Sequence, residues 1–459
     1  MATPSDAFVF FGATGDLAYK QVFPSLQAMV RAGTLDVPVI GVAKAGWDLD
    51  QLKKRAQDSL EEHGGMHRRA FAKLKRLMRY VDGDYADPQT FARLREELGR
   101  SRRPLHYLAI PPALFGTVAQ SLHDSGCAPK GTRIVVEKPF GRDLASAQAL
   151  NRELHKVFPE EAIFRIDHYL GKEPVENLTF FRFANGFLEP IWNRHNIASV
   201  QVTMAESFGV QGRGAFYDSA GAIRDVVQNH MLQIVSLLAM EPPAGNEPDD
   251  FRNRKAELVR ATSPLRKSDV VRGQFRGYRD EPGVAKDSTV ETFAAVRLHI
   301  PTWRWAGVPF LIRAGKCMPE TVAEVLVGIN PPPVGVFKGE RRHHDTLRFR
   351  LQPDVAIGLG VRIKKEGMKM VGEDVELIVQ ESPADDMPPY QRLLGDALNG
   401  DAGLFARQDY VEAAWRVVDP ILGDVVPVVP YDPGTWGPEE ANRITPGGDI
   451  WHDPEPSNG

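Results

Sequence analysis

The chain is poor in cysteine and has no excess of either charge. Its 2 cysteines, Cys127 and Cys317, share no metal-ligand or disulfide spacing, so we expect no bound metal and no disulfide framework. The 56 Lys and Arg residues nearly balance the 60 Asp and Glu residues, for a formal net charge of −4 at pH 7. Without a basic excess, we expect neither nucleic acid nor a membrane surface as a partner.

Long hydrophobic runs are also missing. No apolar stretch approaches the ~18 residues of a membrane-spanning helix, and the N-terminus lacks the basic and apolar segments of a secretory signal. Together with the few cysteines, these absences predict a cytoplasmic protein. The composition, 42% hydrophobic and 25% charged, is typical of globular proteins and excludes disordered, collagen-like and coiled-coil chains.

Short apolar runs alternate with helical patterns in the first third of the chain. This alternation predicts a parallel sheet covered by helices on both faces, an α/β Rossmann-like coenzyme domain over residues 1–170. The expected strands are residues 7–11, 37–43, 105–110, 133–136 and 162–166. The expected helices are residues 17–31, 49–78, 114–123 and 144–157.

The remainder of the chain has many strand candidates with few helices between them. This pattern predicts a larger α+β domain with a mostly antiparallel sheet over residues 171–459. The expected strands are residues 199–205, 292–300, 309–313, 324–329, 346–351, 355–363 and 374–380, and the expected helices are 220–240, 390–398 and 407–418. The tail after Val426 is rich in Pro, Gly and Asp, and we expect it to wrap over the surface or to be partly disordered.

A turn of small residues follows the first expected strand and opens a helix. Small residues there let the backbone approach a pyrophosphate, whose charge is favoured at a helix N-terminus. The spacing G-x-x-G-x-x-A differs from the usual dinucleotide fingerprint, and a tight turn without a ligand is the alternative. The turn consists of Gly12, Ala13, Thr14, Gly15, Asp16, Leu17 and Ala18.

A lysine, Lys44, follows the second expected strand, where a site specific for NAD would place an acid. The nearest acid along the chain is Asp48, four residues further on. A cation at this place suits the 2′-phosphate of NADP. The alternative is a solvated lysine at the end of a strand.

Polar groups follow two later strands. Lys138 lies in the segment EKPFG, after the fourth expected strand, where open α/β sheets bind ligands; a surface turn is the alternative. Asp167, His168, Tyr169 and Lys172 follow the fifth strand. Their donors suit a phosphate monoester and leave the carboxylate to orient a base, whereas structural salt bridging is the alternative.

The second domain carries a further set of polar residues. Glu206 lies in one polar segment, and Asp225 and His230 stand five residues apart near the start of an apolar helix. That spacing is roughly 140° around an α-helix, so both border one cleft without sharing a narrow stripe. A satisfied core histidine is the alternative, but the first two turns are too polar for a core helix.

Together these segments resemble the glucose-6-phosphate dehydrogenase family. The motifs follow the nucleotide turn in the family's order as YLAIPP, EKPFG, RIDHYLGKE, AESFGVQGRGAFYD, IRDVVQNH and VPFLIRAGK. The resemblance covers most of the chain, and RIDHYLGK is highly specific. It implies a Rossmann-like domain plus a larger β+α domain. It also implies oxidation of glucose 6-phosphate at C1 to the 6-phospholactone, the first step of the oxidative pentose phosphate pathway.

The resemblance also implies roles for individual residues. His230 would be the general base, and Asp167 would pair with it and stabilise the imidazolium. His168, Tyr169 and Lys172 would hold the 6-phosphate. The other substrate contacts would be Lys138, which bridges sugar and nicotinamide, and Glu206, Asp225 and Lys316. The coenzyme would contact Gly12, Ala13, Thr14, Gly15, Asp16, Leu17, Lys44, Asp84, Tyr85, Tyr107 and Lys138.

Three places depart from the family pattern. The family often has lysine at Gln21, Arg-Ser at Lys44 and Ala45, and a second cation at Thr321. Lysine lacks the bidentate fork that arginine presents to a phosphate. We therefore expect a modest preference for NADP, with NAD used more weakly.

Two other functions stay open. One is another sugar oxidoreductase with the same two-domain plan, against which the phosphate cluster argues. The other is a catalytically weak paralogue with a regulatory or assembly role, supported only by Gln21 and Thr321. The family's habit predicts a homodimer or homotetramer, formed through the large sheet.

Overall fold

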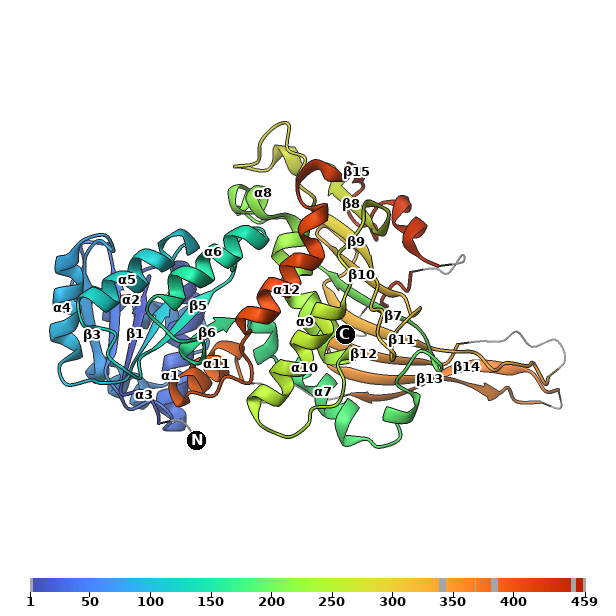
Figure 1. Cartoon of the computed structure of the whole chain (residues 1–459), viewed down its shortest axis with the longest axis horizontal. Helices are drawn as coiled ribbons and strands as arrows, with labels where there is room; N and C mark the ends of the chain where they lie inside the picture. Colours follow the sequence, from blue (N-terminus) through green and yellow to red (C-terminus); the bar gives the residue numbers. More distant parts are fainter. Residues whose placement is uncertain (1–2, 338–343, 368, 381–386, 447–450, 457–459) are drawn as a thin grey trace. The chain divides into compact units, whose positions relative to one another are not determined.

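The computed structural model describes the chain except residues 1–2, 338–343, 368, 381–386, 447–450 and 457–459. The chain divides into two compact units (Figure 1). Unit 1 comprises Met1–Glu173, Pro243–Asn253 and Met387–Glu412, and unit 2 comprises Pro174–Pro242, Arg254–Asp386 and Ala413–Gly459. Compared with the expected division at residue 170, unit 1 also contains two segments from the second half of the chain.

Unit 1 is built on a sheet of six parallel strands in the order β3-β2-β1-β4-β5-β6. All residues of β1, β2, β4, β5 and β6 are buried, which is why these strands read as near-continuous apolar runs. The predicted parallel sheet is confirmed. The strands are β1 (Ala7–Phe11), β2 (Val39–Ala43), β3 (Met78–Asp82), β4 (Pro104–Leu108), β5 (Arg133–Glu137) and β6 (Ile163–Ile166). The helices are α1 (Phe23–Ala32), α2 (Leu49–Glu62), α3 (Arg68–Leu77), α4 (Pro88–Leu98), α5 (Phe115–Asp124), α6 (Leu144–His155) and α11 (Pro389–Asn399).

The single helix expected over residues 49–78 is wrong. The chain forms α2 and α3 instead, separated by a turn in which Gly64 and Gly65 have positive φ. The edge strand β3 follows at once. Only Met78 and Val81 of β3 are buried, so this strand lacks the apolar run that marks the others.

Helix α11 belongs to unit 1 although it follows the strands of unit 2 along the chain. It packs on the turn after β6, where a Cβ atom at Gly171 would lie 2.9 Å from Leu393 Cγ. The carbonyl of Leu398 accepts a hydrogen bond from the N–H of Ser5 at 2.7 Å and one from Arg133 Nη1 at 3.1 Å. Leu393 thus packs on the turn that carries the predicted phosphate cluster, and Leu398 ties the end of the helix to the N-terminal segment and to β5.

Unit 2 is built on a sheet of nine strands in the order β14-β13-β12-β11-β7-β10-β9-β8-β15. Neighbours are antiparallel except the pairs β7–β10 and β8–β15, so the predicted, mostly antiparallel sheet is confirmed. The strands are β7 (Ile197–Ala205), β8 (Val270–Phe275), β9 (Phe293–Leu298), β10 (Phe310–Gly315), β11 (Val322–Ile329), β12 (Thr346–Gln352), β13 (Ala356–Lys364), β14 (Gly372–Gln380) and β15 (Val428–Tyr431). The helices with residues in this unit are α7 (Glu173–Ala184), α8 (Gly214–Ala222), α9 (Leu232–Ala239), α10 (Pro248–Ala261) and α12 (Gln408–Val418). Among the described residues, no helix has the length and apolarity needed to cross a bilayer.

The described part of the C-terminal tail packs on this sheet. The guanidinium of Arg313 on β10 lies 4.7 Å from the ring centroid of Trp436 and 5.0 Å from that of Trp451. Its Nη1 donates to Asp453 Oδ1 at 2.8 Å. A buried cation is thus held between two tail tryptophans and a tail carboxylate.

Candidate functional site

The turn after β1 requires glycine at its first position. Gly12 has a φ of 79°, and a Cβ atom there would lie 2.2 Å from the carbonyl O of Ala109. Its N–H lies 2.9 Å from the Val42 carbonyl O and 2.9 Å from the Tyr85 hydroxyl. The strand order reverses between β1 and β4 at this point, where sheets of this order bind a dinucleotide. A side chain would fill the space between the two strand ends, so the glycine fits a dinucleotide site.

The rest of the turn leads into a helix over residues 16–32. The N–H of Gly15 donates to the carbonyl of Gly12 at 2.9 Å and closes the turn. Gly15, Asp16 and Gln21 are exposed. Gln21 is the position at which the family often has lysine, so the turn presents no cation there.

Lys44 and Asp84 form an ion pair after β2 and β3. Lys44 Nζ lies 2.7 Å from Asp84 Oδ2, and the two side chains are 71% and 46% exposed. The bond to Lys44 lowers the pKa of Asp84, and the same bond raises the pKa of Lys44. The sequence places no acid directly beside Lys44, but the unpredicted strand β3 brings one to it.

Glu137, the last residue of β5, is a buried carboxyl group bonded to two phenols. The Tyr107 hydroxyl donates to Glu137 Oε1 at 2.6 Å, and Tyr390 of α11 donates to the same carboxyl group. Burial raises the pKa of Glu137 to about 7, although both hydroxyls and Lys138 favour the ionised form. Tyr107 is 0% exposed, and its hydroxyl is held by Glu137.

The predicted phosphate cluster forms a compact turn after β6. Asp167 Oδ1 accepts a hydrogen bond from the N–H of Tyr169 at 3.1 Å. Lys172 Nζ lies 4.0 Å from the centroid of the Tyr169 ring, and the His168 ring packs edge-on against that ring at 5.1 Å. The structure therefore brings an ammonium, an imidazole and a phenol together, and these are donors that an anionic monoester requires.

The ends of β7 and β10 bring Glu206 and Lys316 together in unit 2. The two strands are parallel, and the residues just before this pair are register partners. Lys316 Nζ lies 2.5 Å from Glu206 Oε2. The ammonium also lies 5.3 Å from the ring centroid of Phe208 and 5.0 Å from that of Tyr217. A carboxylate and two aromatic faces thus hold this lysine, which is only 8% exposed, in one orientation.

Two further contacts fix the backbone around this ion pair. The Tyr431 hydroxyl on β15 donates to the carbonyl O of Lys316 at 2.6 Å. Thr321 stands where the family commonly has a second cation, and its hydroxyl accepts the N–H of Ser207 at 3.0 Å. This neutral contact links the start of β11 to the residue after Glu206.

Asp225 and His230 lie on a π-helical segment, Ile223–Met231, and not on an α-helix. Backbone hydrogen bonds in a π-helix run between residues five apart, so such residues stack on one side. The expected separation of roughly 140°, which assumes α-helical geometry, is therefore wrong. His230 is 3% exposed, and its backbone N–H donates to Asn229 Oδ1 at 2.6 Å.

A break at Gly221 sets where the π-helical segment begins. Gly221 has a φ of 71°, and a Cβ atom there would lie 2.5 Å from Glu291 Oε1. The same oxygen accepts the N–H of Ile223 at 3.1 Å. Glu291 Oε2 pairs with Arg272 at 2.8 Å, with both side chains buried. A buried ion pair distant in sequence thus fixes the start of the helix that carries His230.

The structure places the predicted site residues in two sets, one in each unit. Unit 2 holds Glu206, Asp225, His230 and Lys316, and unit 1 holds all the others. Sequence reasoning missed the supporting residues Tyr390 and Tyr431, which lie far along the chain from the groups they contact. Glu137, in the segment EKPFG, is also a supporting residue, and a carboxylate that ends an apolar run is a signal that the sequence does contain.

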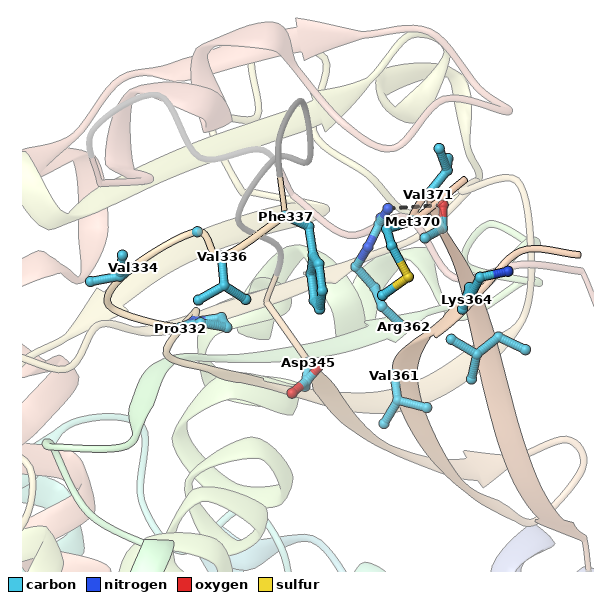
Figure 2. A pocket seen from close by; sticks show the side chains of 13 residues that line it. Pro332, Val334, Val336, Phe337, Asp345, Val361, Arg362, Lys364, Met370 and Val371 are labelled. Carbon is cyan, nitrogen blue, oxygen red and sulfur yellow. Dashed lines mark hydrogen bonds between the residues drawn. The ribbon is translucent and has the colours of Figure 1, made fainter. Parts of the chain in front are cut away.

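A cavity of about 600 Å³ lies at the outer end of the β13–β14 hairpin (Figure 2). The described residues that line it include no predicted site residue. Its wall is mostly apolar, and the Arg362 guanidinium donates to the carbonyl of Gly372 at 3.0 Å. The lining includes Pro332, Val334, Val336, Phe337, Val361 and Met370. This cavity is therefore separate from the candidate site.

Comparisons with known proteins agree with the motif analysis. Residues 9–177 match the family model for the glucose-6-phosphate dehydrogenase NAD binding domain, and residues 179–452 match that for the C-terminal domain of the same family. Glucose-6-phosphate 1-dehydrogenase 1 of Mycobacterium tuberculosis is 42% identical over 98% of this chain and 97% of its own. Glucose-6-phosphate 1-dehydrogenase 5, cytoplasmic, of Arabidopsis thaliana is 37% identical over 96% of this chain and 91% of its own.

Solved structures give the same result. Glucose-6-phosphate 1-dehydrogenase from Mycobacterium avium superposes with a TM-score of 0.92 and 43% identity, over 99% of each chain. A glucose-6-phosphate dehydrogenase in complex with its substrate glucose-6-phosphate superposes with a TM-score of 0.91 and 34% identity. That match covers 99% of this chain and 100% of the other.

We predict that Glu137→Gln changes how stability depends on pH. The carboxyl pKa is 4.5 in the unfolded chain and about 7 in the fold. The folded protein thus keeps a proton that the unfolded chain has lost. This contribution to stability is present below the unfolded pKa and is lost as pH rises through the folded one. The urea midpoint of the variant minus that of the wild type should therefore rise between about pH 4.5 and about pH 7 and level off above that.

The matched control is Glu153→Gln, an exposed glutamate paired with Lys156. Its midpoint difference from the wild type should be flat over the same range. A flat difference for Glu137→Gln as well would show that the buried carboxyl group titrates normally.

Proposed function

Because the chain belongs to the glucose-6-phosphate dehydrogenase family, we propose that it oxidises D-glucose 6-phosphate at C1 to 6-phospho-D-glucono-1,5-lactone. NADP is the preferred coenzyme, with NAD used more weakly. The observation that carries this proposal is the cluster of His168, Tyr169 and Lys172 after β6, in the unit whose Gly12 turn fits a dinucleotide. An oxidoreductase for unphosphorylated sugars has no need of such a cluster.

His230 acts as the general base in this proposal. Its imidazole accepts the proton of the C1 hydroxyl, and a neutral imidazole near pH 7 suits that task. Asp167 stabilises the imidazolium that forms. NADP, when bound, supplies the nicotinamide that accepts the hydride from C1. These roles are supported by the family motifs in which the residues stand.

The remaining polar residues bind and orient the sugar. The donors of His168, Tyr169 and Lys172 bind the 6-phosphate, and Lys138 orients the reacting end of the sugar. Glu206 and Asp225 accept hydrogen bonds from sugar hydroxyls. Lys316 is already held by Glu206 and two aromatic rings, so little conformational entropy is lost when it contacts substrate.

The protein further acts as a homo-oligomer that forms through the large sheet. Leu377 and Val379 on the edge strand β14 are 62% and 68% exposed, and their register partners Leu359 and Ile357 on β13 share that face. These residues line an apolar groove of about 290 Å³ together with Phe181 and other side chains. An exposed apolar strip on an edge strand favours pairing with another copy.

The compartment we propose is the cytoplasm. The name of the Arabidopsis relative supports it, as do the two unpaired cysteines.

His230→Ala should lower turnover at least ~100-fold while both ligands still bind, because the variant loses its general base. Stopped-flow rates and calorimetric titration with glucose 6-phosphate measure the two properties separately. His195→Ala, an exposed histidine of the same unit, is the control and should keep full turnover. Retained turnover in His230→Ala would assign the proton transfer to another group.

Lys172→Ala should raise the KM for glucose 6-phosphate roughly 10- to 150-fold, the worth of a charge-assisted bond to phosphate. The rate with unphosphorylated glucose should change little. Initial rates with both sugars measure this, and the exposed Lys156→Ala is the control. Equal losses with the two sugars would mean that Lys172 does not bind the phosphate.

Leu377→Glu together with Val379→Glu should convert the oligomer to a smaller species in sedimentation velocity, because each subunit would place two negative charges in an apolar contact. Trp303→Glu, at a residue that is 90% exposed in the same unit, should keep the wild-type size. An unchanged sedimentation coefficient for the double variant would place the interface elsewhere.

A further inference from the structure

The carboxyl ends of β2 and β3 lie side by side, with Ala43 and Asp82 as register partners. In dinucleotide-binding sheets, the group at the end of the second strand meets the adenosine ribose. An acid there accepts from the ribose hydroxyls of NAD, and a cation there accommodates the 2′-phosphate of NADP. The donors and acceptors at these two strand ends therefore decide between the coenzymes.

The segment after β2 has the donors that a phosphate requires. Lys44 supplies an ammonium, and the next three residues supply consecutive backbone N–H groups. Consecutive N–H groups in a turn form a concave nest that binds anions. Taken alone, this segment is built for a 2′-phosphate.

Two acids, one at the end of β3 and one two residues after it, already use these donors. Asp82 Oδ1 accepts from the N–H groups of Ala45, Gly46 and Trp47 at 2.9, 2.8 and 3.3 Å. Asp84 Oδ2 accepts from Lys44 Nζ at 2.7 Å. The anion position at this strand end is thus filled by the protein's own carboxylates.

Both acids are held in the ionised form. Burial acts to raise the pKa of Asp82, but the three N–H groups and the Tyr80 hydroxyl outweigh it, so the net shift is downward. The bonds from Lys44 and from the N–H of Ala86 lower the pKa of Asp84. One negative charge therefore pairs with Lys44 and another occupies the N–H groups that follow it, so an incoming 2′-phosphate must displace one and lie near the other.

We propose that Asp82 and Asp84 determine coenzyme specificity in this chain. Their carboxylates compete with the 2′-phosphate of NADP for Lys44 and for the N–H nest, and they accept hydrogen bonds from the free ribose hydroxyls of NAD. The result is a weakened preference for NADP. This inference rests on the proposed function for the identity of the coenzyme site. It deepens that proposal by naming the two carboxylates that compete with the 2′-phosphate of NADP for Lys44 and the neighbouring N–H groups.

Calorimetric titration of NADP and NAD into the wild type and into Asp84→Asn tests the proposal without any turnover. The ratio of the Kd for NAD to that for NADP should rise about 5- to 10-fold in Asp84→Asn, because the lysine is released and one repulsive charge is removed. Asp82→Asn should shift the ratio in the same direction, with a thermal melt to check that the turn is intact.

The matched control is Asp36→Asn, an exposed acid of unit 1 that pairs with Lys73 at 2.8 Å before β2. Its ratio should stay within about twofold of the wild type, as expected for an exposed ion pair away from the coenzyme. A ratio within that range for Asp84→Asn would overturn the proposal. Rates with glucose 6-phosphate test the proposed function separately, since the binding ratio is measured whether or not that sugar is oxidised.

Discussion

The need to satisfy buried ionisable groups with hydrogen-bond or charged partners is the constraint on which both units depend. A carboxylate or guanidinium inside a sheet costs several kcal/mol unless a partner satisfies it. Arg272 meets Glu291 in the core of unit 2, and Glu137 meets two tyrosine hydroxyls in unit 1. Both of these groups support a site residue. The Arg272–Glu291 pair fixes the start of the helix that carries His230, and Glu137 directly precedes Lys138 in the chain.

The two sets of site residues are held by different means. In unit 1, backbone geometry does most of the positioning, because a glycine at position 12 lets two strand ends approach and a compact turn gathers the phosphate donors. In unit 2, side-chain contacts do most of the positioning. Lys316 is oriented by Glu206 and two aromatic rings, and its carbonyl accepts a hydrogen bond from the Tyr431 hydroxyl. Substitutions that leave the sheets intact therefore perturb the second set more readily than the first.

The sequence alone predicts the strands that are buried on both faces, the two-domain plan and the motifs whose chemistry is local. It fails where the pattern is weak or the contact is distant. Strand β3 is a half-exposed edge strand without an apolar run, so the sequence shows no acid next to Lys44, although Asp84 pairs with it in the structure. The π-helical segment fails for another reason: no residue pattern distinguishes it from an α-helix, so the geometry of Asp225 and His230 is misjudged.

The groups at β10 are satisfied by tail residues that are synthesised much later than the strand itself. Tyr431 and Asp453 stand 115 and 140 residues after the groups that they satisfy, the Lys316 carbonyl directly after β10 and the Arg313 guanidinium on it. During translation β10 leaves the ribosome long before either partner exists. A chain that stops short of Tyr431 therefore lacks both the hydrogen bond to the Lys316 carbonyl and the tail groups that cover and pair the Arg313 guanidinium.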